Sequence, residues 1–112
     1  MTVAITEYLE IDLDAEVWRC RACGDEIAPA RESYKRGLLL YDRDPRDIFP
    51  AGIDGEHGFA PDPRWCRIVE YYCPGCGTQV ETEYLPPGHP LTHDIEIDVD
   101  ALKAARRAQE EA

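Results

Sequence analysis

The stretch "VEYYCPGCGTQVETEYL" (residues 69–85) places a cysteine pair, Cys73 and Cys76, between two segments with strand-like patterns. A spacing of two residues lets both sulfur atoms of a tight turn face one metal ion. The glycine that follows, Gly77, suits the positive φ that such a turn requires. Segments 65–73 and 79–85 are predicted to be the flanking strands. Two thiolates complete only half of a tetrahedral site, so the other ligands must lie elsewhere.

A second pair with the same spacing, Cys20 and Cys23, occurs in "CRACG" (residues 20–24). One such pair is weak evidence for a metal site, whereas two in a small chain are strong evidence for a zinc ribbon. Four thiolates fill the tetrahedron around Zn²⁺ and leave no position for water or substrate. The sequence therefore predicts a structural zinc site whose ligands are Cys20, Cys23, Cys73 and Cys76.

Two other interpretations of these four cysteines stay open. Iron in a rubredoxin-like site uses the same ligands. A redox dithiol normally opens a helix in a thioredoxin-like unit, and no such pattern surrounds either pair. The fifth cysteine, Cys66, lies outside the pair spacing in an apolar strand, and we expect it to be a buried structural thiol.

Three histidines are the remaining candidates for chemistry: His57, His89 and His93. No HExxH motif, no H-x-E motif near a cysteine pair and no three-histidine cluster is present. We expect structural or surface histidines and predict no catalytic residue and no cofactor-binding residue of this chain.

The remaining patterns predict a mostly β, small α+β fold: a rubredoxin-like zinc ribbon with an extended N-terminal segment over residues 1–100. Alternating apolar and acidic residues predict strands at 5–14 and 94–99, and the apolar run within 34–42 predicts another. Residues 101–112 are rich in alanine and predict a short helix or frayed tail.

Residues 42–64 are rich in proline and glycine and predict a long irregular loop inserted between the two cysteine pairs. One interpretation is a disordered surface loop. The other is an arm that lies against a partner, because the segment also carries large apolar side chains.

The net charge of −11, from 23 acidic and 12 basic residues, argues against nucleic acid as a partner. The acidic strands are interpreted as solvated faces, or alternatively as a surface that matches a basic groove on a partner. No segment has the length or apolar character of a membrane span, and the first residues lack the apolar run of a secretory signal. We expect a cytoplasmic protein whose cysteines stay reduced.

The run "EYYCPGCGT" followed by "PPGHPLTHD" resembles the small zinc-binding subunits of ATP-dependent ketone carboxylases, which include the gamma subunit of acetone carboxylase and the small subunit of acetophenone carboxylase. The resemblance covers residues 65–100 and extends to the first cysteine pair and to "SYKRG" (33–37). The cysteine turn is common to many ribbons, so "LPPGHPLTHD" makes the match specific.

The resemblance implies a non-catalytic zinc-bearing subunit that helps to assemble and stabilise a multisubunit carboxylase. The larger partner subunits in that family resemble hydantoinases and 5-oxoprolinases, and they carry ATP and a divalent metal. They phosphorylate the ketone and bicarbonate before the carbon–carbon bond forms. The alternatives are a stand-alone rubredoxin-like redox protein, a zinc-ribbon adaptor of another enzyme complex, a nucleic-acid-binding ribbon and a small enzyme active without partners.

Overall fold

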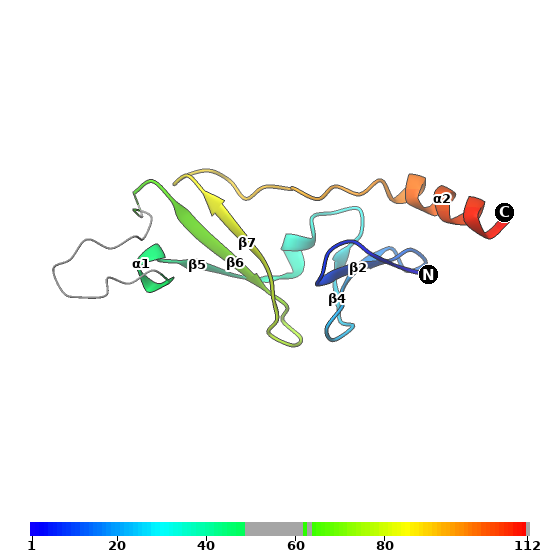
Figure 1. The fold of residues 1–112 in the computed structure, drawn as a ribbon, viewed down its shortest axis with the longest axis horizontal. Helices are drawn as coiled ribbons and strands as arrows, with labels where there is room; N and C mark the ends of the chain where they lie inside the picture. The colour runs from blue at the N-terminus through cyan, green and yellow to red at the C-terminus, as the bar shows by residue number, and fades with distance from the viewer. Residues whose placement is uncertain (49–61, 63, 112) are drawn as a thin grey trace.

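The computed structural model describes residues 1–48, 62 and 64–111. The molecule is elongated, with principal extents of 66 × 26 × 23 Å. Two antiparallel sheets follow one another along the long axis, and a helix extends beyond the sheet that contains the N-terminus (Figure 1). The prediction of a mostly β fold is confirmed. Within the described part of the chain, no helix is both long enough and apolar enough to cross a membrane.

The first sheet contains β1 (Thr2–Ala4), β2 (Leu9–Asp12), β3 (Val17–Cys20) and β4 (Glu26–Pro29), hydrogen-bonded in this order. In β2 the predicted alternation is present, because Leu9 and Ile11 are buried while the acidic residues between and after them are only half-buried. The strand predicted over 5–14 is too long. A turn interrupts it, in which the N–H groups of Ile5 and Thr6 both donate to the Leu9 carbonyl.

The second sheet contains β5 (Leu39–Arg43), β6 (Arg67–Tyr72) and β7 (Gln79–Leu85), with β6 in the centre. The strands predicted over 65–73 and 79–85 are therefore confirmed. The strand predicted from the apolar run within 34–42 is confirmed as β5, and the residues that precede this run form a 3₁₀ helix, η1 (Tyr34–Gly37). The side chain of Ser33 accepts a hydrogen bond from the Lys35 N–H and caps η1, which favours a helical turn there.

The loop predicted over 42–64 contains the end of β5 and one helical turn, α1 (Pro45–Ile48). The two interpretations of this loop, a disordered segment or an arm against a partner, concern residues 49–61. These residues lie outside the part that the structure describes.

The strand predicted over 94–99 is wrong. Residues 86–98 form a strap that runs without regular secondary structure along both sheets to α2 (Val99–Glu111) (Figure 1). Ile95 and Ile97 pack against the core, which explains the alternating pattern, but no neighbouring strand pairs with their backbone. The helix begins before the predicted position 101 because the Asp98 carboxylate accepts a hydrogen bond from the Ala101 N–H at 3.0 Å.

Ion pairs fasten the start of α2 to the first sheet. Arg31 contacts Glu16 at 2.6 Å and Asp100 at 2.8 Å, and Lys103 contacts Glu16 at 2.6 Å. Val99 is buried and belongs to the core. The strap is thus held at its C-terminal end by charge pairs and by one buried side chain.

One cluster of buried side chains contains residues from both sheets. Trp18 of β3 and Tyr34 of η1 are fully buried and their rings lie 5.4 Å apart. The Trp18 indole donates to the Glu32 carbonyl at 3.1 Å, so its polar atom is satisfied. Val69 and Tyr71 of β6 belong to the same cluster. The two sheets therefore share a core rather than forming separate ones.

Gly37 marks the closest contact between η1 and β4. A Cβ atom at this position would lie 1.6 Å from the Ile27 carbonyl oxygen, which belongs to the backbone. Gly37→Ala is expected to lower the free energy of unfolding by about 3 kcal/mol, because backbone cannot move aside cheaply. Gly88→Ala is the control, because its Cβ would meet no heavy atom within 4 Å and only the φ of +81° disfavours the substitution. Urea denaturation of both variants measures the difference, and an equal or larger loss for Gly88→Ala would contradict this account.

Candidate metal centre

The two cysteine pairs form two hairpin turns with the same backbone geometry. The first turn joins β3 to β4 and the second joins β6 to β7. The N–H of each closing glycine donates to the carbonyl of the first cysteine at 2.8 Å. Gly24 and Gly77 have φ values of +80° and +76°, which favour glycine. The sequence spacing therefore produces two cysteine turns, or knuckles, with matching hydrogen bonds and glycine conformations.

The knuckles face each other and bring the four sulfur atoms together. All four lie within 4.8 Å of one another. The distance between sulfur atoms is 3.8 Å for Cys20 and Cys76, and 3.7 Å for Cys23 and Cys73. Zinc–sulfur bonds of about 2.3 Å in a tetrahedron place the sulfurs about 3.8 Å apart. The residues present thus fit a metal ion with four thiolate ligands. The four cysteines that the sequence predicts as ligands lie together in the arrangement that a zinc site requires.

Burial divides the four thiols into two kinds. Cys20 and Cys73, at the ends of β3 and β6, are fully buried and belong to the core, whereas Cys23 and Cys76 are exposed. A Cβ at Gly75 would lie 1.8 Å from the Asp25 carboxylate, so the two knuckles are packed tightly together. The site therefore lies at the surface junction of the two sheets.

Without a cation, the thiols differ in their affinity for protons. Hydrogen bonds from the Thr78 hydroxyl and N–H lower the pKa of Cys76 to about 7. The Asp25 N–H lowers the pKa of Cys23, but partial desolvation and the neighbouring thiols outweigh this effect and raise the pKa to about 12. Thiolates this close repel each other, and a bound cation removes the repulsion.

The other predicted candidates lie outside this cluster. Cys66 is only half-buried, so the expectation of a buried thiol is wrong; it lies just before the first residue of β6 and not within the strand. His89 and His93 are exposed, as expected for surface histidines. His57 lies outside the described residues. Among the described residues, only the four cysteines form a group with metal-ligand geometry.

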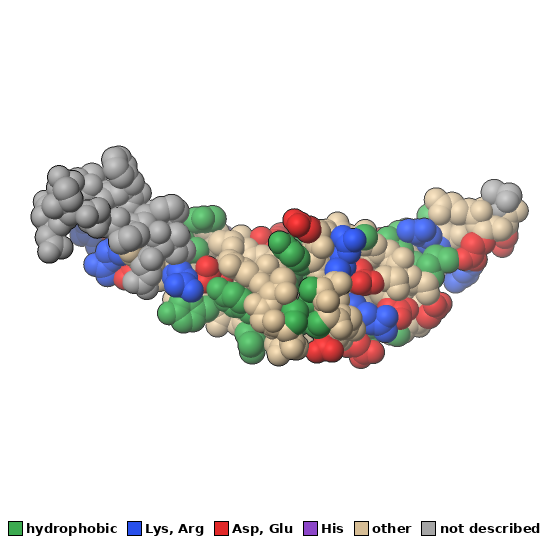
Figure 2. Space-filling model, turned by 60° about the horizontal axis from the view of Figure 1, so that its bottom comes forward, with side chains coloured by type: hydrophobic (Ala, Val, Ile, Leu, Met, Phe, Trp, Pro, Cys, Tyr) green, Lys and Arg blue, Asp and Glu red, His purple; other side chains and the backbone are tan. Residues whose placement is uncertain are grey.

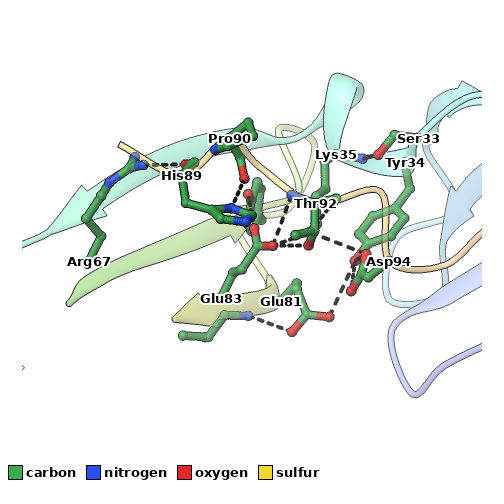
Figure 3. A network of polar contacts seen from close by, with 12 residues as sticks. Ser33, Tyr34, Lys35, Arg67, Glu81, Glu83, His89, Pro90, Thr92 and Asp94 are labelled. Carbon is green, nitrogen blue, oxygen red and sulfur yellow. Dashed lines mark hydrogen bonds and ion pairs between the residues drawn. The ribbon is translucent and has the colours of Figure 1, made fainter. Parts of the chain in front are cut away.

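A second polar site, which the sequence analysis missed, surrounds Lys35. The side chain is 5% exposed, and its Nζ lies 3.1 Å from Glu83 and 3.3 Å from Asp94. It also donates to the Thr92 carbonyl at 2.7 Å. Nζ lies 5.2 Å from the centre of the Tyr71 ring as well. Figure 3 shows how η1, β7 and the strap converge on this cation. One lysine among polar and charged neighbours in "RESYKRG" (31–37) carries no periodic signal that would have revealed its burial.

The carboxylates around Lys35 are fully satisfied. Burial alone would raise the pKa of Glu83, but hydrogen bonds from Thr92, Tyr71 and Lys35 hold it at about 2. Tyr34 donates to Asp94 at 3.1 Å, and burial together with the Asp94 charge raises the pKa of this phenol. Lys35 and Glu83 thus form a buried ion pair in which each charge has several partners.

Comparison with known proteins places these features in one family. The family model described as the acetone carboxylase gamma subunit matches residues 3–107. The chain belongs to this family.

Two named relatives agree with this assignment. The chain is 57% identical over 102 residues to the acetophenone carboxylase beta subunit of Aromatoleum aromaticum, covering 91% of this chain and 79% of that protein. It is 31% identical over 88 residues to the acetone carboxylase gamma subunit of Xanthobacter autotrophicus, covering 75% of this chain. The aligned region spans about half of that protein, 48% of its length. The resemblance inferred from the sequence is confirmed.

The Lys35 site joins two of the segments that the family resemblance covers. Lys35 lies in "SYKRG", while Thr92 and Asp94 lie in "PPGHPLTHD". Earlier in the strap, the His89 carbonyl accepts a hydrogen bond from Arg67 of β6 at 3.3 Å. Both segments therefore serve one structural purpose, which is to fix the course of the strap across the sheets.

Replacing Lys35 with methionine keeps the length of the side chain but leaves Glu83 and Asp94 without their cation. The free energy of unfolding is expected to fall by about 3 kcal/mol, as is typical when one partner of a buried pair is removed. Lys103→Met is the control, because its pair with Glu16 is more exposed to solvent and is expected to contribute much less to stability. Denaturation at pH 7 compares the two, and equal losses would show that Lys35 does not anchor the strap.

Proposed function

We propose that this chain is a non-catalytic, zinc-binding structural subunit of a multisubunit ATP-dependent ketone carboxylase. The observation that carries the proposal is the closed set of four cysteine sulfurs at tetrahedral spacing. Such a set has no free coordination position, so a bound ion has a structural role and does not bind substrate. Cys20, Cys23, Cys73 and Cys76 are the proposed ligands of one zinc ion.

Zinc has a clear energetic role in this architecture. The thiol pairs that it bridges are separated by 50 and 56 residues along the chain, and a link across so long a loop removes much entropy from the unfolded state. Metal binding and folding are coupled when the ligands come together only in the folded chain. Backbone N–H groups of Ala22 and Cys23 point at the Cys20 sulfur and offset part of the negative charge of the site.

Catalysis is assigned to other chains of the complex. Both named relatives are called carboxylase subunits, which supports membership of a multisubunit enzyme. We propose larger hydantoinase- and oxoprolinase-like subunits as partners, with ATP and a divalent metal bound there. The complex is expected in the cytoplasm, where the thiols stay reduced and available to zinc.

A second candidate function is that of a rubredoxin-like electron carrier, because four thiolates bind iron with the same geometry. Iron–thiolate centres absorb visible light and zinc–thiolate centres do not. A colourless protein with one zinc per chain is expected, and a coloured protein that contains iron would favour the redox role.

Cys76→Ser is expected to abolish zinc binding and to unfold both knuckles, because one of the four ligands is lost. Metal analysis and circular dichroism of the purified protein measure these effects. Cys66→Ser is the matched control, because this thiol lies outside the cluster, and it is expected to retain zinc and fold. If Cys76→Ser kept both its zinc and its fold, the structural-site proposal would fail.

The assembly role is tested by purifying the tagged chain from its native host. Large carboxylase subunits are expected to copurify in fixed stoichiometry, identified by mass spectrometry, and ATP-dependent ketone carboxylation is expected only in the complex. The large subunits are not expected to copurify with the Cys76→Ser variant. Carboxylation by the purified chain alone would contradict the non-catalytic assignment.

A further inference from the structure

The edge strand β5 is the least protected sheet edge among the described residues. It is hydrogen-bonded to β6 on one side only, and no described residue supplies backbone hydrogen bonds to its other side. The other sheet edges are either short or in contact with another part of the chain. Strand β1 has only three residues, η1 lies against the Ile27 carbonyl of β4, and the Glu83 side chain of β7 binds the strap. A bare edge offers unpaired backbone groups to another chain.

The side chains of β5 are also unusual, because three consecutive large apolar residues are exposed. Leu39, Leu40 and Tyr41 are 57%, 47% and 50% exposed. An ordinary edge strand of a monomeric protein carries charged residues that repel other strands. Here Asp42 and Arg43 lie only at its end, and both are already paired with residues of β6.

The strand register confines this apolar surface to the edge strand. Leu39 and Tyr41 point to one face of the sheet and Leu40 to the other, because side chains alternate along a strand. On the neighbouring strand, the residue opposite Tyr41 is Glu70, which is buried and paired with Arg43. Hydrophobic side chains are visible in Figure 2 on the half of the molecule that contains this sheet. The free edge and the exposed side chains along it thus form one docking surface, defined by Leu39, Leu40 and Tyr41.

We infer that β5 accepts an extended strand of a larger carboxylase subunit, which lengthens the sheet by one strand. An unpaired backbone edge is completed only by another extended backbone, and exposed side chains on both sides of β5 call for a partner strand with apolar residues on both faces. A second copy of this chain is a poor occupant, because two molecules that each carry a net charge of −11 repel each other. The identity of the occupant rests on the proposed function.

The double variant Leu39→Lys/Tyr41→Lys tests this surface. It places two ammonium groups where the added strand would bury apolar contacts, and its affinity for the isolated large subunits is expected to fall at least about tenfold. The control Tyr8→Lys/Leu91→Lys changes the charge equally at two exposed positions elsewhere, and its affinity is expected to stay within about threefold of the original. Zinc content and circular dichroism confirm that both variants fold.

Hydrogen exchange on the native complex supplies the second measurement. Backbone amides of residues 39–43 that exchange in the free chain are expected to become protected in the complex. If the chain assembles but the β5 variant binds as well as the control and these amides stay unprotected, the docking surface is wrong while the proposed function stands. If the original chain does not bind the large subunits, both the docking surface and the proposed function are wrong. A homodimer that the β5 variant abolishes would show that the occupant is a second copy.

Discussion

The structure depends on the approach of two hairpin turns that are far apart in the sequence. Four sulfur atoms within 4.8 Å join the end of β3 to the end of β6, and through these strands the two sheets. Cys20 and Cys73 are themselves part of the shared core, so the metal centre and the apolar packing position each other. In a chain of 112 residues with a modest core, the proposed metal bridge is expected to supply stability that burial alone does not.

The second constraint is the strap over residues 86–98. It has no ladder hydrogen bonds of its own, and contacts at three places hold it: Arg67 near its start, Lys35 in the middle and Arg31 just beyond its end. The middle contact is buried and fully satisfied, which makes it specific as well as stabilising. Because the strap follows both sheets, it fixes their relative position together with the cysteine cluster. The apolar edge β5 remains free on the other side of the three-stranded sheet.

Local features of the fold were predictable from the sequence, and features that depend on distant contacts were not. The cysteine spacing and Gly77 identified the knuckles, and β7 has the predicted bounds. Alternation over residues 94–99 failed, because a strap with one buried face produces the same pattern as a strand. Strands β3 and β4 are only four residues each and carry no clear period. The Lys35 site depends on residues 83, 92 and 94, so only tertiary structure reveals it.

In this small family member, a cluster of four cysteines joins two sheets, a buried lysine holds the strap, and an apolar edge faces outward. We propose that four thiolates and nothing else surround the bound ion. X-ray absorption at the zinc edge of the native protein tests this claim directly. We predict four sulfur neighbours at about 2.3 Å and no nitrogen or oxygen neighbour. A mixed shell that contains oxygen or nitrogen would contradict the claim, because it would indicate an open position or a different set of ligands.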